Sequence, residues 1–392
     1  MSNPTPAVAP VRRLFSLDVL RGLTIAFMIM VNNNGGRAAW AAMHHAEWNG
    51  LTPTDLVFPT FLFVVGVSIV FAYEARLAKG ATRAELTRHT AQRAGVLIVL
   101  GIIVNSFPTF ELVHMRFYGV LQRIAVCYLI VGLFYLWDRR VWTKIVTLVA
   151  ALVGYWILMR WVPVPGAGIP GQDIPLLDKG QNLVSWLDRQ LMPSHLYEDF
   201  TTHNLCDPEG LLSDLPALGT ALLGLLTALW LRTERSFKTK AAGLVVGSAA
   251  CLALGYTWSI WFPLNKKLWT SSFVLTAAGW SLLVFALSFY AVEVKGWGKE
   301  GWTRGVTWPW KILGSNAIAA YMISELIPGL VGLVSWDEGE MKMNGLRWLR
   351  VHFFQAVIPD RGWAAFAYSF SFLAVCFVPV WIMYRKKIFL KV

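Results

Sequence analysis

Charged residues are scarce in this 392-residue chain: Asp, Glu, Lys and Arg make up 15% of it, whereas hydrophobic residues make up 56%. A soluble domain of this size needs a larger charged surface, so the composition excludes that class. The mean hydropathy is +0.51, and the chain contains 20 tryptophans. These values predict an all-α integral membrane protein.

Cysteine is also rare, and several catalytic signatures are missing. Three of the 4 cysteines lie in hydrophobic segments and Cys206 is alone in a predicted outer loop, so we expect no disulfide framework. The sequence has no Cys/His metal spacing, no glycine-rich phosphate loop, no Gly-x-Ser-x-Gly elbow and no internal repeat. We therefore expect no metal, and any chemistry must come from polar groups at membrane depth.

Hydrophobic runs predict about ten transmembrane helices. Six runs are free of charge and of spanning or near-spanning length: 56–73, 94–110, 215–231, 241–265, 268–292 and 362–384. Four weaker runs complete the set: 22–36, 124–137, 145–159 and 312–336, the last of which is interrupted by Glu325. We expect one transmembrane domain over residues 1–392.

The distribution of positive charge predicts the topology. With the N-terminus inside, the cytoplasmic segments hold 22 Lys and Arg residues and the outer segments hold 11, while Arg21 and Arg123 lie within spans. This asymmetry predicts that both termini are cytoplasmic. Basic inner loops facing anionic lipid explain the net charge of +12, so no nucleic acid partner is expected. Asp18 and Arg21 within the first hydrophobic stretch argue against a signal peptide.

Two longer connections have a soluble character. The outer one, at about 160–210, holds an amphipathic piece around 183–191 and a run 207–210 of Asp-Pro-Glu-Gly. Loops of this length in a compact bundle are usually functional or disordered. The inner one, 295–311, carries four tryptophans among basic residues, and a segment lying on the membrane surface explains it better than a binding platform does.

A histidine pair, His44 and His45, lies between two hydrophobic spans. Imidazole changes charge near neutral pH, which suits it to proton transfer at a membrane boundary. A wet interfacial loop explains the same residues equally well.

Polar groups within or beside the spans are costly in lipid, so they usually face a partner or a cavity. Asp18 and Arg21 lie three residues apart and can pair with each other. Asp55 and Asp207 have the sequence context of helix N-terminal residues. Together these groups predict a polar cavity that reaches from both faces toward the bilayer middle; the others are Asn32, Asn33, Asn34, Gln122, Arg123, Asn316 and Glu325.

The order of several motifs resembles the heparan-α-glucosaminide N-acetyltransferase family. The most specific is the stretch His-Ala-Glu-Trp-Asn-Gly-Leu-Thr-Pro-Thr-Asp-Leu-Val-Phe-Pro at 45–59. The others are Ser-Leu-Asp-Val-Leu-Arg-Gly at 16–22, Val-Asn at 31–32, Phe-Val-Val-Gly-Val-Ser at 63–68, Gly-Val-Leu-Gln-Arg-Ile at 119–124, Asp-Pro-Glu-Gly at 207–210, Asn-Lys-Lys-Leu-Trp-Thr at 265–270, Leu-Gly-Ser-Asn-Ala-Ile at 313–318 and Lys-Lys-Ile-Phe-Leu-Lys at 386–391. The chain looks like a bacterial inner-membrane member of the kind associated with N-acetylglucosamine use.

The resemblance implies transmembrane acetylation, in which cytoplasmic acetyl-CoA supplies the acetyl group to a terminal, glucosamine-like amino sugar on the periplasmic side. It assigns His45, rather than His44, as general base or as an acetyl carrier. Asn32 matches the asparagine of the family's Val-Asn motif and is suited to stabilise the oxyanion. The link from Asn32 to His45 is two residues longer here, at Asn33 and Asn34.

The same resemblance assigns the two ends of the site. Arg13, Arg21 and Lys391 match positions linked to CoA, whose phosphates need cations. Gln122 and Arg123 are expected to shape the cavity or contact the acetyl end, and Asn316 is a further coenzyme candidate. The acceptor candidates are Asn49, Asp55, Asp207 and Glu209, for which helix capping is an equally good explanation.

Two other functions remain open at this point. Ten helices with central polar residues also suit an amino-sugar transporter. A membrane O-acetyltransferase acting on a periplasmic glycan fits the same features. Consumption of acetyl-CoA separates an enzyme from the transporter, and an amide or ester product separates the two enzymes. The oligomeric state, including a homodimer, also remains open.

Overall fold

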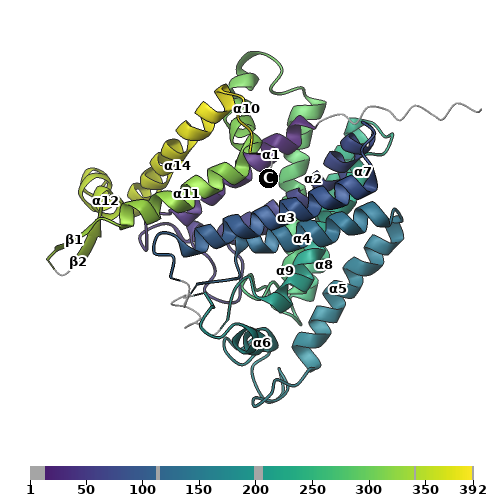
Figure 1. Cartoon of the computed structure of the whole chain (residues 1–392), viewed down its shortest axis with the longest axis horizontal. Helices are drawn as coiled ribbons and strands as arrows, with labels where there is room; N and C mark the ends of the chain where they lie inside the picture. Colours follow the sequence, from purple (N-terminus) through teal and green to yellow (C-terminus); the bar gives the residue numbers. More distant parts are fainter. Residues whose placement is uncertain (1–13, 112–114, 198–205, 340, 391–392) are drawn as a thin grey trace, which may run out of the picture.

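The computed structural model describes residues 14–111, 115–197, 206–339 and 341–390. Helices dominate this part of the chain (Figure 1). They are α1 (Phe15–Asn32), α2 (Val57–Leu77), α3 (Arg83–Ser106), α4 (Val120–Trp137), α5 (Val141–Trp161), α6 (Leu183–Leu191), α7 (Asp214–Leu231), α8 (Phe237–Trp258), α9 (Ser271–Phe289), α10 (Gly301–Ser315), α11 (Ala317–Gly332), α12 (Gly345–Leu349), α13 (Gln355–Val357) and α14 (Arg361–Arg385). The fold class predicted from composition is confirmed.

Among the described residues, eight helices are long and apolar enough to cross a membrane: α1, α2, α4, α5, α7, α8, α9 and α14. The two remaining predicted spans correspond to α3 and α11. Charged side chains occupy the first half of α3, and α11 has only 16 residues, fewer than the roughly 20 that cross a bilayer unaided. The helix α1 begins at Phe15, seven residues before the run that predicted it, so Asp18 and Arg21 lie within the helix.

The inner connection at 295–311, which was expected to lie on the membrane surface, is largely helical. It contains most of α10, which packs along α1. A Cβ atom at Gly22 would lie 1.8 Å from the carbonyl oxygen of Trp310, and one at Gly314 would lie 2.0 Å from that of Asp18. The two backbones therefore touch, and Asn316 separates α10 from α11.

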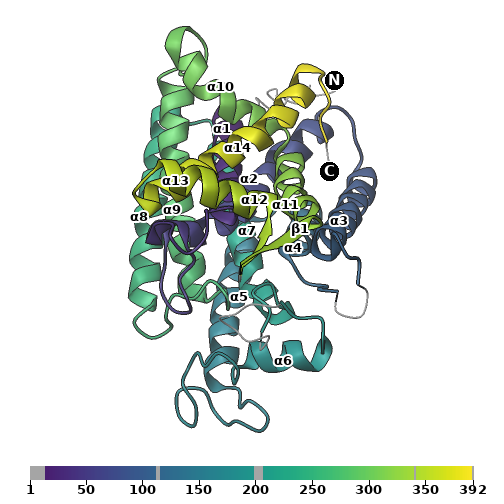
Figure 2. The same cartoon turned by 90° about the vertical axis from the view of Figure 1, so that its left-hand side faces the viewer.

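The outer connection at about 160–210 contains α6, which covers the predicted amphipathic piece. Figures 1 and 2 show α10 at one end of the bundle and α6 at the other. A short antiparallel hairpin of β1 (Ser335–Glu338) and β2 (Met341–Asn344) follows α11 and was not expected.

The interior of the bundle consists of helices that are buried on most sides. Within their apolar windows, 67% of α2 and 78% of the α9 span is buried, against 28% for α5, 22% for α8 and 33% for α14. The inner helices can cross closely because of glycine. A Cβ atom at Gly66 of α2 would lie 1.9 Å from the Ala221 oxygen of α7, and one at Gly224 would lie 2.0 Å from the Phe63 oxygen. Small residues at such crossings are how membrane helices pack tightly.

We predict that Gly66→Ala lowers the unfolding temperature in detergent, because the added methyl group must push α2 away from α7. Overpacking of this kind costs about 1–3 kcal/mol. The matched control is Gly154→Ala in α5, where a Cβ atom meets nothing within 4 Å. Equal unfolding temperatures for the two variants would contradict the close crossing.

Candidate functional site

The loop between α1 and α2 places His45 against Asp55. The Nδ1 atom of His45 lies 2.7 Å from Oδ1 of Asp55. Oδ2 of Asp55 accepts hydrogen bonds from the backbone N–H of Ala46 (3.1 Å) and from the backbone N–H and hydroxyl of Thr52 (2.9 and 3.0 Å). The side chain of His45 is 43% exposed and that of Asp55 is 1% exposed. The carboxylate is therefore buried and engaged, whereas the imidazole is accessible.

A helix cap explains the position of Asp55. Thr52 and Asp55 form a capping box on the 3₁₀ turn Pro53–Leu56 that leads into α2. This confirms the expected helix N-terminal role. The sequence pattern of the cap did not indicate the contact with His45. Asp55 was also expected to bind the acceptor, but both of its oxygens already accept hydrogen bonds within the protein.

The second ring nitrogen of His45 faces a lysine. Nζ of Lys266 lies 3.3 Å from Nε2 of His45. Because the ionised Asp55 only accepts hydrogen bonds, Nδ1 of His45 carries the hydrogen and Nε2 has the lone pair. Partial burial of the ring and the neighbouring Lys266 lower the pKa of His45, and the bond to Asp55 opposes that change. No role was expected for Lys266, although it belongs to the motif at 265–270.

The connection between α8 and α9 holds Lys266 in place. The backbone N–H of Gly50 donates to the carbonyl of Leu264 (2.8 Å), and Nδ2 of Asn265 donates to Oδ1 of Asn49 (3.1 Å). Oδ1 of Asn265 in turn accepts from the N–H of Leu268 (2.8 Å). The His45 loop and the Lys266 loop therefore form one unit, with the exposed Asn49, an expected acceptor contact, at its edge.

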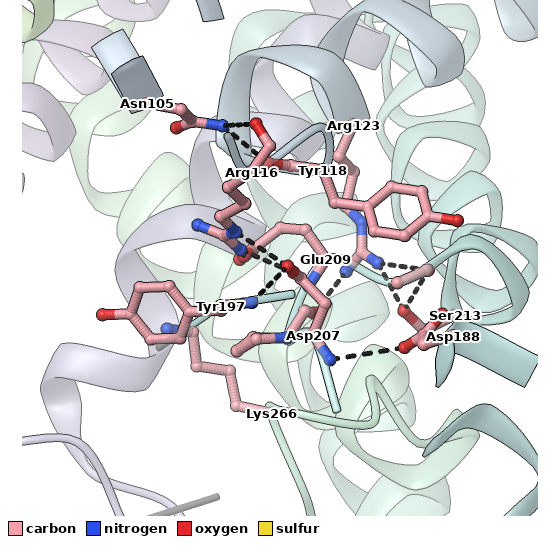
Figure 3. Close-up of polar contacts among 12 residues, drawn as sticks. Asn105, Arg116, Tyr118, Arg123, Asp188, Tyr197, Asp207, Glu209, Ser213 and Lys266 are labelled. Atoms are coloured by element: carbon pink, nitrogen blue, oxygen red, sulfur yellow. Dashed lines mark hydrogen bonds and ion pairs between the residues drawn. The ribbon is translucent and has the colours of Figure 1, made fainter. Parts of the chain in front are cut away.

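A buried ion network lies next to this unit (Figure 3). Arg116 donates from Nε and Nη2 to the two oxygens of Asp207 (2.7 and 2.5 Å) and from Nη2 to Glu209, and it covers the ring of Tyr197. Asp207 is 0% exposed and Glu209 is 6% exposed. Pro208 and Glu209 form a turn and no helix begins there, so the helix N-terminal role expected of Asp207 is wrong. The amide of Asp207 donates to Asp188 on α6, and burial raises the pKa of that carboxyl to about 7. Nothing in the sequence paired Arg116, which precedes α4, with the run at 207–210.

Arg123 joins α4 to the start of α7. Its Nε atom donates to Asp214 (2.8 Å), and its terminal nitrogens donate to the backbone oxygens of Pro208 and Gly210 (each 3.1 Å). A further bond reaches Ser213. The side chain is 1% exposed, so the structure places Arg123 in a clamp on the 207–214 segment and away from the inner cavity described next.

The inner cavity has a volume of about 460 Å³ and is lined by α1, α2, α3, α4 and the α10–α11 junction. Three arginines line it: Arg21, Arg76 and Arg93. Arg21 bonds to Asp18 (3.3 Å) and to the hydroxyl of Ser68 (2.8 Å), which confirms the expected pairing within α1. Arg76 and Arg93 were counted only as topological charges, because their approach to Arg21 depends on how the helices pack.

The other coenzyme candidates have different positions. Asn316 is 1% exposed and bonds to the backbone of the chain end, at Ile388 (3.0 Å) and Leu390 (3.0 Å). Leu390 lines the inner cavity, so Asn316 holds part of its wall. Gln122 is 9% exposed and lies against Gly101 and Gly119, outside the cavity lining. Arg13 and Lys391 lie outside the described residues.

A second cavity of about 10 Å³ shares Phe61, Leu121, Ile124 and Ile318 with the inner cavity. Its remaining lining residues are Ile25, Met28, Val120 and Tyr321. It has space for about one water molecule. This small apolar cavity therefore adjoins the inner cavity.

Asn32, at the end of α1, is paired with α11. Its Nδ2 atom donates to Oε1 of Glu325 (2.8 Å). An amide nitrogen carries two hydrogens, and this bond uses one. The expected oxyanion donor thus shares its amide with a carboxyl group from the ninth predicted span.

We predict that Arg123→Gln lowers the unfolding temperature but leaves CoA affinity of the folded protein unchanged. Removing the cation leaves Asp214 without its partner, and breaking a buried ion pair costs on the order of 3–5 kcal/mol. The guanidinium of Arg123 lies 4.9 Å from the ring centroid of Trp269. The control is therefore Arg235→Gln, an exposed arginine that lies at the same distance from the ring of Trp230. Unchanged stability with weakened CoA binding would contradict the clamp and favour a coenzyme contact.

The chain is similar to proteins of one family along its whole length. A family model described as "Heparan-alpha-glucosaminide N-acetyltransferase, catalytic" matches residues 13–169. The mouse heparan-alpha-glucosaminide N-acetyltransferase is 26% identical over 442 residues, and the human protein of that name is 28% identical over 432 residues. These alignments cover 100% and 97% of this chain but 62% and 60% of the two relatives, so the chain spans about three fifths of their length. The matches confirm the relationship of this chain to the heparan-α-glucosaminide N-acetyltransferase family.

Proposed function

We propose that the protein is a multi-pass N-acetyltransferase of the bacterial inner membrane, which moves the acetyl group of cytoplasmic acetyl-CoA to an amino sugar on the periplasmic side. One observation carries the proposal. An arginine-lined inner cavity and a partly accessible His–Asp pair lie in different parts of the fold, and a small apolar cavity adjoins the first.

The inner cavity fits the charged end of the donor. CoA carries several phosphate charges, and arginine forks match phosphate oxygens well. Arg76 is exposed and Arg93 is partly exposed at the rim, whereas Arg21 is held by Asp18 and Ser68. The apolar remainder of the lining suits the uncharged part of the donor, and we place the thioester at the side that adjoins the small apolar cavity.

The His45–Asp55 pair supplies the base. Asp55 holds the ring in the tautomer that leaves Nε2 unprotonated, as general base catalysis requires. In direct transfer, the amine nitrogen bonds to the carbonyl carbon while the carbon–sulfur bond breaks and the electron pair leaves with sulfur. Nε2 takes the amine proton and returns it to the departing sulfur. An acetyl carrier role would use the same nitrogen as nucleophile.

The remaining candidates take supporting parts in this proposal. The second amide hydrogen of Asn32 is suited to the oxyanion. Asn49 is the exposed acceptor candidate beside His45, whereas Asp207 and Glu209 are bound to Arg116 and shape the outer wall. The ends of the bundle marked by α10 and α6 then face the cytoplasm and the periplasm, as the charge asymmetry predicts.

For the coenzyme end, we predict that Arg93→Gln and Arg76→Gln each weaken CoA binding about tenfold, the size of a lost charge-assisted hydrogen bond. The loss should shrink as salt is raised, because exposed charges are screened. Calorimetric titration with CoA measures the affinity. Arg88→Gln, an exposed arginine of α3 outside the cavity lining, is the control. An equal loss in all three variants would contradict a specific phosphate site.

For the whole reaction, we predict transfer across sealed inside-out vesicles. Externally added acetyl-CoA should label an impermeant amino sugar trapped in the lumen, and an external sugar should stay unlabelled. His45→Ala should reduce labelling on the order of 10²- to 10⁴-fold, the usual contribution of a general base. His44→Ala is the matched control, because its ring bonds to Asn34 and not to Asp55.

Three outcomes of the vesicle experiment would contradict the proposal. Labelling of the external sugar alone would indicate a one-sided acetyltransferase. Uptake of intact sugar without consumption of acetyl-CoA would favour the transporter. An ester product on a glycan would favour the O-acetyltransferase.

A further inference from the structure

Lys266 is in direct contact with the proposed base and has no part in the reaction described above. Its Nζ atom lies 3.3 Å from Nε2 of His45, the nitrogen that faces away from Asp55. The bonds of Asn265 to Asn49 and Leu268 hold the loop that carries it. These bonds fix the backbone on both sides of Lys266, so its side chain starts from a defined position next to the ring.

We propose that Lys266 is a positioning residue: its ammonium group, set against Nε2 of His45, keeps that nitrogen unprotonated until the acceptor amine arrives. This inference rests on the proposed function, because it concerns the state of the same imidazole.

The chemistry of the two groups supports the proposal. An ammonium group has three donors and no acceptor, so it can only donate to Nε2. A neutral ring with its hydrogen on Nδ1 satisfies both neighbours, since Asp55 accepts at one nitrogen and Lys266 donates at the other. A protonated ring would instead point an N–H group at an ammonium hydrogen and place two positive charges about 3 Å apart.

The surrounding charges act in defined directions on the imidazole. Asp55, from the turn before α2, and Glu209, from the segment before α7, both favour a protonated His45. Partial burial of the ring, the largest effect, and Lys266 oppose them, and the pKa of His45 is lowered. Burial, the largest effect, lowers the pKa of Lys266, and Glu209 and Asp55 oppose that change by favouring its charged form. The lysine therefore adds to the effect of burial and works against the two carboxylates, which favour the protonated ring.

The same contact affects the return of the proton. When Nε2 takes the proton of the amine, the ring becomes cationic beside Lys266. The repulsion favours rapid delivery of that proton to the departing sulfur. The lysine would thus lower the pH at which the base is available and also shorten the life of its protonated form.

The test measures the protonation of His45 directly. Diethyl pyrocarbonate reacts with a histidine ring in its neutral form and not in its protonated form. Peptide mass spectrometry measures the modification rate at His45 as a function of pH. We expect the wild-type midpoint to lie below that of an ordinary histidine, and we expect Lys266→Met to move it to higher pH. His352, on the segment between α12 and α13, is the internal control and should keep its midpoint.

Two further variants keep the test decisive. Lys266→Arg retains the charge and should keep the midpoint near that of the wild type, while Lys267→Met removes the neighbouring charge and should shift it less than Lys266→Met. If Lys266→Met does not fold, Lys266→Cys treated with bromoethylamine rebuilds an ammonium group and should restore the low midpoint of the untreated wild type.

The outcomes distinguish this proposal from the function on which it rests. The acidic limb of the pH profile of kcat/KM should move to higher pH in Lys266→Met, in parallel with the modification midpoint. An unchanged midpoint at His45 in the folded Lys266→Met protein would overturn the proposal, whatever the activity. A shifted midpoint in a protein that transfers no acetyl group would support the contact and overturn the proposed function.

Discussion

The site depends on one buried carboxylate, that of Asp55. One of its oxygens binds the imidazole of His45, and the other closes the cap that begins the turn into α2. A change that loosened the cap would therefore also release the ring. Because α2 crosses α7 at a glycine contact, the ring orientation is tied to the packing of the bundle interior.

The buried ion network of Arg116 and Arg123 shows how charged side chains are stabilised away from water. Arg116 binds two carboxylates of the segment 207–214, and Arg123 binds a third carboxylate together with two backbone oxygens of the same segment. Each guanidinium supplies several donors in a fixed plane, so each can hold several acceptors at once. A segment that lacks regular structure until Leu211 is thereby fixed against α4. This order is needed next to Lys266, whose loop packs against the His45 loop.

The sequence predicted the helices better than it predicted the contacts between them. Hydropathy located the spans, and the context of Asp55 indicated a helix cap. Neither signal indicated that Lys266, 221 positions from His45, would contact the imidazole ring of His45. The arginines predicted to bind the coenzyme did not include Arg76 and Arg93, because these two line the same cavity as Arg21 only after three helices pack together. Local patterns record local structure, whereas these pairs depend on tertiary geometry.

The acetyl group that the proposed reaction moves is uncharged, and this has an electrical consequence. Moving one elementary charge across a membrane involves about 2.3 kcal/mol per 100 mV, whereas an uncharged group crosses without electrical work. The small cavity lined by Phe61 and Tyr321 has only apolar neighbours besides the tyrosine hydroxyl, so it offers no ionised partner to a charged cargo. Under the proposed function, the transfer step is therefore independent of the membrane potential.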